Sequence, residues 1–523
     1  MSLTKKIKIV AFLFLITGGN ISGWAQTDSK ENTTSVSTKK IMLLKTPWSE
    51  SENAGSLSFF DFDKKIGSAL VYTELQNKDF HLFREGHKSF GTGFLTNGFI
   101  KYGNWNFYGN FNYFNQTEKN TKWTGVMNPY DGNPYSIGDS IGGNYTKEYF
   151  KMHGKGALWL SNLVTIGFNI DYSAGVGAKR KDPRFENTIT SFCISPGIIF
   201  TLNKIKLGAN LKYQEEKEDI EISDVTGNIY YIFHFKGLGV SSSTPNYDTH
   251  VYTSDLLGGS IQIGFNNKRL QNLTEISFYK KSTAIKQGET FPLQLALLER
   301  YNTGIKSTFI FHEKSRTVNR LNLFFNNKHF YGNEPVVEPQ LQSVSYQWST
   351  ITKYTLFWHK EIEYGIQYSF YKIIDKNRID WGAQLSGNFN TNKTTYYFVP
   401  EFNEKKLNLL NLNVKLEKGF RMQKTDVVAE INGGLQKGYN GKLTIVEEES
   451  LLSTVNAKML THDFNYFNSK QIQIGTSATV GRDIIFNRKP IQLFAGAAFK
   501  NVISELQGKP KSASFEVKLG VNF

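Results

Sequence analysis

The sequence predicts an all-β fold, a transmembrane up-and-down antiparallel β-barrel of about 18 strands, within a range of about 16 to 20. Three observations predict it. Apolar and polar residues alternate along many segments, and the connections between these segments are alternately short and long. The chain also begins with an export signal and ends on a two-faced aromatic strand. Alternation with a period of two places the two sets of side chains on opposite faces of a sheet.

The export signal occupies residues 1–25. Three lysines precede an apolar run from Ile9 to Thr17, and a small-residue site follows, so cleavage is expected between Ala25 and Gln26. The apolar run is too short for a membrane anchor. Removal of this segment takes three lysines and no acids from a net charge of +15, which leaves +12. The sequence therefore predicts an exported protein of the Gram-negative outer membrane.

The composition of the 523-residue chain favours strands. It is 39% hydrophobic and 14% aromatic with only 12 Pro, which suits alternating strands joined by polar turns. A mean hydropathy of −0.38 fits a membrane barrel, because each spanning strand turns half of its residues to the lumen. The single cysteine, Cys193, has no partner for an internal disulfide and is interpreted as a small apolar filler, with a reactive thiol as the alternative.

One segment shows the alternation clearly. Its apolar set runs from Ile205 to Tyr213, and Lys206, Asn210 and Lys212 belong to the opposite face. The expected strands are 67–76, 89–102, 105–116, 149–161, 164–174, 189–202, 204–215, 255–267, 272–282, 297–311, 318–329, one long strand within 343–374, 378–391, 405–419, 424–437, 467–481, 490–501 and 513–523.

The connections between these strands differ in length in a regular order. Tight turns are expected near 103–104, 162, 203–204, 375–377 and 420–424, and long polar links near 117–149, 175–188, 215–253 and 439–462. A membrane barrel with tight periplasmic turns and long outer loops has this rhythm. A soluble sandwich has no reason to keep its long loops at one end.

The final strand carries an apolar face that a soluble protein could not leave uncovered. That face consists of Phe515, Val517, Leu519, Val521 and Phe523. Lipid accepts it, provided that the strand pairs with the first one, because an open edge in hydrocarbon leaves backbone groups without partners. The strand resembles the sorting signal of outer-membrane barrels, which implies the barrel-assembly machinery as a partner.

Several stretches resemble a known family. They are Trp123–Tyr145 ("WTGVMNPYDGNPYSIGDSIGGNY"), Asp171–Asn187 ("DYSAGVGAKRKDPRFEN"), "EGHKSFG" from Glu85, and the final strand. From about residue 50 to the end, the chain resembles an uncharacterised outer-membrane β-barrel family of Gram-negative bacteria, labelled as a domain of unknown function. The resemblance implies a membrane barrel and supplies no activity. Relatives more often carry Asp at position 128, so a metal role for Asn128 is not expected.

The loop from Asn128 to Gly143 is the first candidate for a functional site. Gly and Pro fix tight turns there, so the loop is expected to be ordered and to fold into the lumen as a constriction or ligand loop. A compact surface loop without a ligand is the alternative. The candidate residues are Asn128, Pro129, Tyr130, Asp131, Asn133, Tyr135 and Asp139.

A basic stretch, "AKRKDPR", is the second candidate. It places Lys179, Arg180, Lys181 and Arg184 on an expected outer loop. Such a loop could bind anionic lipopolysaccharide or steer an anionic solute, and a solvated charge run is the alternative. The expected partners are outer-membrane lipid, lipopolysaccharide and a surface lipoprotein; nucleic acid is not expected.

Catalytic and metal motifs are not found in the sequence. No H-E-x-x-H, CxxC or phosphate-loop pattern occurs, and "GTSATVG" at 475–481 is not a nucleophile elbow. The nine histidines lie in no recognisable nucleophile motif. We therefore expect no enzyme and no cofactor.

The expected organisation is a signal peptide at 1–25, a periplasmic segment at 26–62 and the barrel at 63–523. No large amino-terminal plug domain is expected, which disfavours an energised receptor. The leading hypothesis is a passive, porin-like channel or selective transporter for a small solute. The alternative is a barrel that docks a surface lipoprotein or secretion component. A third class stays open because "TPWSESENAGSL" at 46–57 resembles the start of hydrophobic-compound transporters.

Overall fold

The computed structural model describes residues 34–62, 65–245, 247–267, 269–311, 316–342, 345–398, 400–446 and 451–523. The predicted signal peptide and its cleavage site between Ala25 and Gln26 lie outside the described residues.

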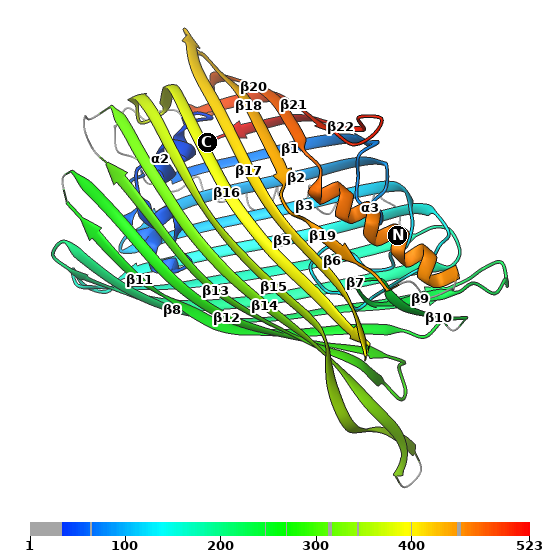
Figure 1. Ribbon diagram of the computed structural model, residues 1–523. Helices are drawn as coiled ribbons and strands as arrows, with labels where there is room; N and C mark the ends of the chain where they lie inside the picture. The colour runs from blue at the N-terminus through cyan, green and yellow to red at the C-terminus, as the bar shows by residue number, and fades with distance from the viewer. Residues whose placement is uncertain are drawn as a thin grey trace.

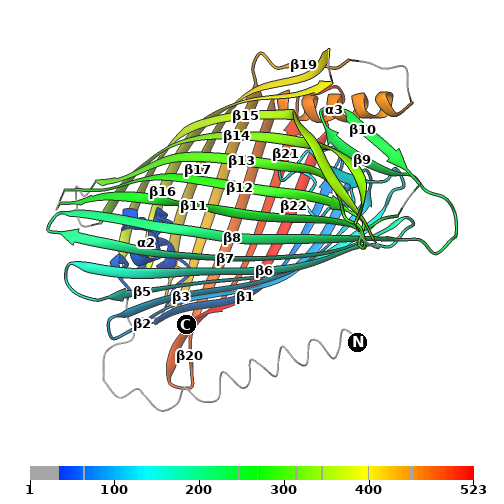
Figure 2. The same cartoon turned by 90° about the horizontal axis from the view of Figure 1, so that it is seen from below.

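Eighteen antiparallel strands form a closed barrel (Figures 1 and 2). Each strand pairs with its neighbours in chain order, and β1 (Lys65–Lys78) pairs with β22 (Lys511–Asn522) to close the ring. The other wall strands are β2 (Lys88–Tyr102), β3 (Trp105–Thr121), β5 (Gly143–Trp159), β6 (Val164–Lys179), β7 (Arg184–Leu202), β8 (Ile205–Ser223), β11 (His250–Asn266), β12 (Leu270–Gln287), β13 (Leu293–Phe311), β14 (Thr317–Gln342), β15 (Ser345–Asp375), β16 (Arg378–Phe398), β17 (Glu401–Met422), β18 (Thr425–Gly438), β20 (Gln471–Phe486) and β21 (Lys489–Ser504). The predicted fold class and strand count are confirmed.

The seam between the first and last strands is fully paired. The Phe523 amide donates to the Gly67 carbonyl at 2.9 Å, and the Gly67 amide donates to the Phe523 carbonyl at 2.7 Å. Pairing continues from Ser68 opposite Asn522 to Lys78 opposite Ser512. The prediction that the final strand pairs with the first is therefore confirmed. No strand edge of the described ring is left open to hydrocarbon.

The outer wall is apolar. Leu211 on β8 and Ile261 on β11 are 67% and 63% exposed, whereas the alternate residues Asn210 and Gln262 are buried against the lumen side. A row of large apolar side chains that face outward is what a barrel wall in lipid requires. The alternation from Ile205 to Tyr213 is thus confirmed.

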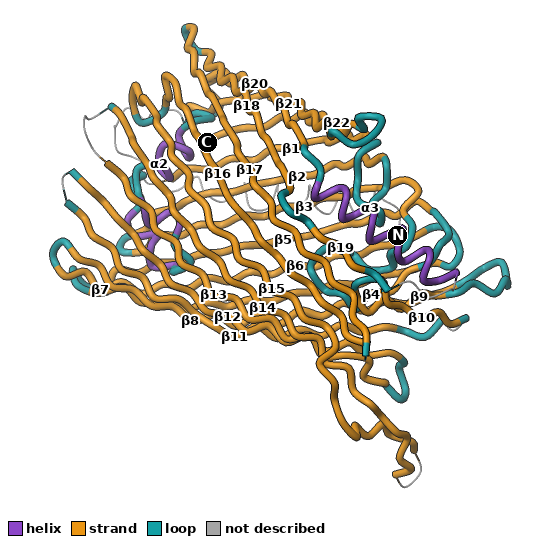
Figure 3. The backbone as a smooth tube through the Cα atoms, viewed as in Figure 1, coloured by secondary structure: helices purple, strands orange, loops and turns teal. Residues whose placement is uncertain are grey.

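Most strands extend further at the long-loop end than the sequence predicted. The largest extension is a hairpin arm formed by residues 334–342 of β14 and 345–356 of β15, which projects beyond both neighbouring strands (Figures 1 and 3). Pairing of β14 with β13 ends at Asn333, and pairing of β15 with β16 starts at Phe357. Polar composition hid these extensions, because strands above a membrane need no apolar face.

The loops contain elements that the sequence analysis did not predict. They are β4 (Ser136–Gly138), β9 (Ile232–Gly237) and β10 (Val240–Thr244), which form a separate three-stranded sheet, β19 (Lys442–Thr444), which pairs with β17, and the helix α3 (Leu451–Asn468).

Residues 34–62, here called the plug segment, pack inside the barrel at its short-turn end (Figure 2). The segment contains α2 (Thr38–Leu44) and the 3-10 helices η1 (Pro47–Glu50) and η2 (Ala54–Phe59). These elements contact β3, β5, β6, β7, β12, β13 and β16. The segment was expected to lie in the periplasm. Its described part lies in the lumen because the polar lumen wall supplies hydrogen-bonding partners along its length.

Among the described residues, no helix has the length and apolarity needed to cross a membrane.

Candidate functional site

The loop between β3 and β5 crosses the outer mouth of the barrel. Arg300 on β13, seven strands further around the ring, donates to the Asp131 carbonyl at 3.0 Å. The ring of Phe330 on β14 lies beside Gly132. Tyr135 is buried, and its hydroxyl lies against Gly332 of β14. The loop therefore reaches from one wall to the opposite wall, as expected of a constriction loop.

The other candidate residues in this loop hold it in shape. The Asp131 carboxylate accepts from the Asn133 amide at 2.8 Å, and the Asn133 side chain accepts from the Tyr135 amide at 3.1 Å. Asn128 accepts from the Asp131 amide through its carbonyl at 3.4 Å, and Pro129 is half-buried. None of these contacts requires a ligand, so a ligand role for these residues stays a prediction.

Asp139 is buried with Lys179 at the end of β6. The Lys179 ammonium contacts the Asp139 carboxylate, and the Ile141 amide donates to the same carboxylate at 2.6 Å. Burial raises the pKa of Asp139 above its ordinary value, although Lys179 opposes that effect. The pair anchors the end of the crossing loop to the wall.

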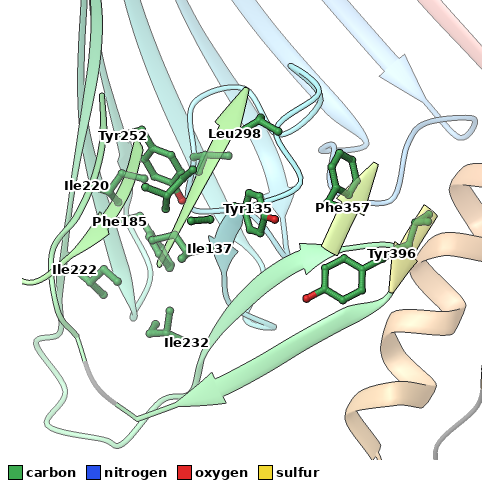
Figure 4. Close-up of a cluster of buried hydrophobic side chains, with 14 residues drawn as sticks. Tyr135, Ile137, Phe185, Ile220, Ile222, Ile232, Tyr252, Leu298, Phe357 and Tyr396 are labelled. Carbon is green, nitrogen blue, oxygen red and sulfur yellow. The ribbon is translucent and has the colours of Figure 1, made fainter. Parts of the chain in front are cut away.

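The crossing loop also contributes β4 to the small sheet. Ser136 and Gly138 pair with Phe235 and Phe233 of β9, which belongs to the loop between β8 and β11. Under this sheet lies an apolar cluster that joins loops to wall strands (Figure 4). Its labelled members are Tyr135, Ile137, Phe185, Ile220, Ile222, Ile232, Tyr252, Leu298, Phe357 and Tyr396. The outer lid, as we call these joined loops, thus has a core of its own.

Arg84 joins four outer loops. It lies in the β1–β2 loop, and its guanidinium donates to Ser136 Oγ at 2.8 Å and lies 4.2 Å over the Phe235 ring. Its Nε lies 3.4 Å from the sulfur of Met459 on α3. Burial lowers the pKa of Arg84. No sequence motif marks this residue, because its partners come from distant loops.

Tyr130 completes the same junction. Its hydroxyl accepts from the Arg84 amide at 2.9 Å and donates to Asp463 on α3 at 3.0 Å. Burial and the Asp463 carboxylate raise the pKa of Tyr130. Asp463 also accepts from the Phe83 amide at 2.8 Å. The helix α3 is therefore held across the lid by a polar network.

The basic stretch divides into paired and exposed residues. Lys179 is buried with Asp139, and Arg184 donates to Asp182 at 2.7 Å. Asp182 in turn accepts from the amides of Val225 and Thr226 at 3.2 and 3.1 Å, so part of the stretch ties neighbouring loops together. Arg180 and Lys181 are exposed, and they alone keep the accessibility that binding of lipopolysaccharide phosphate needs.

At the opposite end, the plug segment is held by a buried turn. The Asn53 side chain is fully buried, and its Nδ2 lies 3.0 Å from the Ile198 carbonyl, the Ala209 carbonyl and Gln262 Oε1. Ser51 Oγ donates to Glu275 of β12 at 2.7 Å. This turn approaches the wall closely because Gly167 on β6 leaves room, and a Cβ there would overlap the backbone of Ala54 and Gly55.

Ion pairs hold the rest of the plug segment. Glu50 lies 2.5 Å from Lys306 on β13 and 2.9 Å from Arg320 on β14. Lys40 contacts Glu417 on β17 and lies 3.6 Å from Glu430 on β18. Burial acts to raise the pKa of Glu50, but the two cations outweigh it, so its pKa lies below the ordinary value. These polar contacts reach strands on different sides of the ring and can be exchanged for water. Apolar clusters around Ile41, Leu57 and Trp48 hold the segment as well.

Several cavities border the plug segment. One of about 410 Å³ lies between α2 and the wall and is lined by Lys39, Lys40, Glu50, Arg320 and Tyr371 among others. Another, of about 1440 Å³, opens between η1, η2 and the short turns, with Trp48, Phe59, Trp159 and Lys206 in its lining. The segment therefore fills only part of the lumen at this end.

Within the described ranges, no group of three or more His, Cys, Asp or Glu side chains is placed to hold a metal ion. Cys193 is buried on the lumen side of β7.

The chain belongs to the Family of unknown function (DUF6850), whose pattern it matches over residues 56–523. This agrees with the resemblance seen in the sequence. No curated protein sequence matches the chain at a significant level.

Solved structures of similar shape include several outer-membrane proteins. The RagAB peptide transporter has a TM-score of 0.42 at 6% identity, covering 88% of this chain and 87% of that one. The copper transporter OprC has a TM-score of 0.41 at 7% identity, covering 88% and 82%. The outer membrane transporter YddB from Escherichia coli has a TM-score of 0.37 at 9% identity, covering 88% and 81%. At these TM-scores, none of the likenesses bears on the function of this chain.

Proposed function

We propose that the protein is an outer-membrane channel or selective transporter for a small polar solute, exported with a cleaved signal peptide, and that the plug segment must shift for solute to pass. The observation that carries this proposal is a polar-lined barrel whose short-turn end is filled by a short segment held through ion pairs, hydrogen bonds and three small apolar clusters.

Passive movement of solute agrees with the small size of the plug segment. The described segment has 29 residues, 34–62, and no separate folded domain fills the lumen among the described residues. Once the segment shifts, selectivity would come from the side chains of the wall and from the outer lid.

The plug segment offers a direct test. The variant Gly167→Ala places a methyl group against Ala54 and Gly55, and should loosen η2 from the wall. The matched control is Gly109→Ala on β3, where an added Cβ meets nothing within 4 Å. In planar bilayers we expect a higher conductance for Gly167→Ala than for the wild type, and an unchanged conductance for Gly109→Ala. Equal, absent conductance in all three proteins would contradict the proposal.

A docking barrel is the second candidate, and the outer surface favours it. The hairpin arm of β14 and β15 projects from the ring, and the outer lid has its own apolar core. A protein that conducts no ions in any variant, but co-purifies from its native membrane with one lipoprotein in constant proportion, would support this alternative. Transport of a hydrophobic compound is the third candidate, since "ENAGSL" lies in the plug segment at η2.

A further inference from the structure

The lumen wall between the plug segment and the outer lid carries a stacked pair of aromatic rings. Tyr72 of β1 and Phe114 of β3 both lean over β2. An added Cβ at Gly93 would overlap the Tyr72 ring, and one at Gly91 would lie 2.7 Å from the Phe114 ring. The two ring planes differ by 9°, with centroids 5.8 Å apart. Because inward glycines accommodate them, the two rings stack on each other over β2, on the lumen side of the wall.

This pair of rings lies between the two closures. On β3, Asn106 donates to the Leu57 carbonyl of the plug segment at 3.1 Å. Further along, Glu118 lies 3.8 Å from Lys147, which donates to the Met127 carbonyl in the crossing loop. Phe114 lies between these two points on the same strand. A solute that crosses the barrel would therefore meet the rings between plug segment and lid.

Amide side chains flank the rings on this wall. The Tyr72 hydroxyl lies 3.3 Å from Asn112 Oδ1, which leaves the Asn112 amide nitrogen for another partner.

The opposite wall repeats the arrangement. Phe324 of β14 lies over Gly365 of β15, where an added Cβ would be 2.6 Å from the ring. Asn388 and Asn390 of β16 are next to it, donating to Glu363 at 2.7 Å and to Glu361 at 3.0 Å. Two sides of the lumen thus combine an aromatic ring with amide groups.

Several charges along the lumen wall are neutralised by partners one or two strands away. Lys328 lies 2.9 Å from Glu361, Lys281 lies 2.9 Å from Glu216, and Lys415 lies 2.8 Å from Glu430. Paired charges supply hydrogen-bond donors and acceptors without a strong net field. Such a wall suits a neutral solute rich in hydroxyl groups better than an ion.

We propose that Tyr72, Phe114 and Phe324 form a binding track for a neutral oligosaccharide, with Asn112 and Asn388 binding its hydroxyl groups. A sugar ring has an apolar C–H face that stacks on an aromatic ring, and a polar rim that takes part in hydrogen bonds with amides. This inference rests on the proposed function, because it names the class of solute that the channel takes.

Rings that pack over glycines could also act only to stabilise the barrel wall. The chain offers a matched control that distinguishes this role from sugar binding. Phe168 lies over Gly156 in the same manner, but it faces outward and is 38% exposed toward lipid. A loss of wall packing would be shared by Phe168→Ala, whereas a loss of sugar binding would not.

The test is calorimetric titration of the full-length protein in detergent with maltotetraose, with tetra-alanine as a peptide probe of similar length. We expect binding of maltotetraose, a Kd raised about threefold or more by Phe114→Ala or Tyr72→Ala, recovery in Phe114→Tyr, and no change in Phe168→Ala. Heat-modifiable gel mobility checks that each variant is folded. Should Tyr72→Ala fail to fold, Phe324→Ala takes its place.

The outcomes separate the inference from the proposed function. Absence of maltotetraose binding, an unchanged Kd in both ring variants, or an equal loss in Phe168→Ala overturns the inference. Tetra-alanine binding that depends equally on the rings overturns it in favour of a peptide track. Ion conductance without sugar binding would support the channel and contradict the sugar-binding track. Sugar binding without conductance would support the track and contradict the channel.

Discussion

At the scale of single residues, Asn53 is the side chain on which the seating of the plug segment depends most. It has no exposed surface, and it connects the segment to β7, β8 and β11 through contacts of 3.0 Å. Removal of a buried amide leaves several polar partners unsatisfied, at a cost of about 1–3 kcal/mol each in the worst case. This residue should therefore control how often the segment leaves the wall.

We expect Asn53→Ala to raise single-channel conductance or open probability while the barrel stays folded. Asn104→Ala, in an exposed short turn, is the control and should leave both unchanged. Bilayer recordings measure the conductance, and heat-modifiable mobility measures the fold. An Asn53→Ala protein that is as closed as the wild type would show that the ion pairs suffice to hold the segment.

Glu50 makes the binding of the plug segment to the barrel wall sensitive to pH. Its pKa is lowered in the folded protein, so the contact with Lys306 and Arg320 contributes stability above the ordinary value of 4.5 and loses it as pH falls through the lowered pKa. We expect conductance to rise on acidification below about pH 4.5. Glu50→Gln should already conduct at neutral pH and should lose this part of the pH response. If the conductance of Glu50→Gln still rises on acidification as in the wild type, groups other than Glu50 cause the pH response.

At the scale of elements, the helix α3 connects the loops of the outer lid to one another. Asn456 donates to Ser241 Oγ of β10 at 2.8 Å, and Asn403 donates to the Leu238 carbonyl at 2.7 Å. The lid is therefore held together by contacts between loops that are far apart in sequence. If solute enters from outside, α3 and β10 have to separate.

A disulfide across this contact would test that movement. In a Cys193→Ser background, Asn456→Cys with Ser241→Cys should form a reducible bond, because the two side chains are already in contact. We expect solute flux into liposomes to fall on oxidation and to recover with a reductant. Each single-cysteine variant serves as a control. Flux that is indifferent to the bond would place the entry route elsewhere in the lid.

At the scale of the whole molecule, closure of the ring depends on β22. This strand pairs with β1 on one side and with β21 on the other, and its outward residues include Leu519 and Phe523. Without it, β1 and β21 would both present unpaired backbone to hydrocarbon.

Deletion of residues 511–523 should therefore abolish assembly rather than merely weaken it. We expect loss of the heat-modifiable band and loss of protein from the outer-membrane fraction. The single variant Phe523→Ala removes one ring but no backbone pairing, and it should retain a folded band. A folded band in the deletion would mean that another pair of strands closes the ring.

The wall was predictable from the sequence, because a strand between lipid and water repeats its pattern every two residues. The segment from Ile205 to Tyr213 shows this alternation in both the sequence and the structure. The lid and plug segment were not predictable in the same way. Arg84 acquires its partners from loops up to several hundred residues away, and the residues of α3 have no strong apolar face that periodicity would reveal. The candidate residues of the crossing loop lie over the mouth, and both the constriction and their chemical roles stay predictions.

The position of α2 beside the seam has a consequence for biogenesis. The Val36 amide, just before α2, donates to Gln492 on β21 at 2.8 Å, and Lys39 of α2 donates to Asn97 on β2 at 2.9 Å, so residues 36–39 touch strands on either side of the β1–β22 junction. A hydrophilic peptide cannot easily be threaded into a finished cylinder surrounded by lipid. Enclosure of α2 and completion of the cylinder should then be concurrent events, with a shared rate during insertion into vesicles.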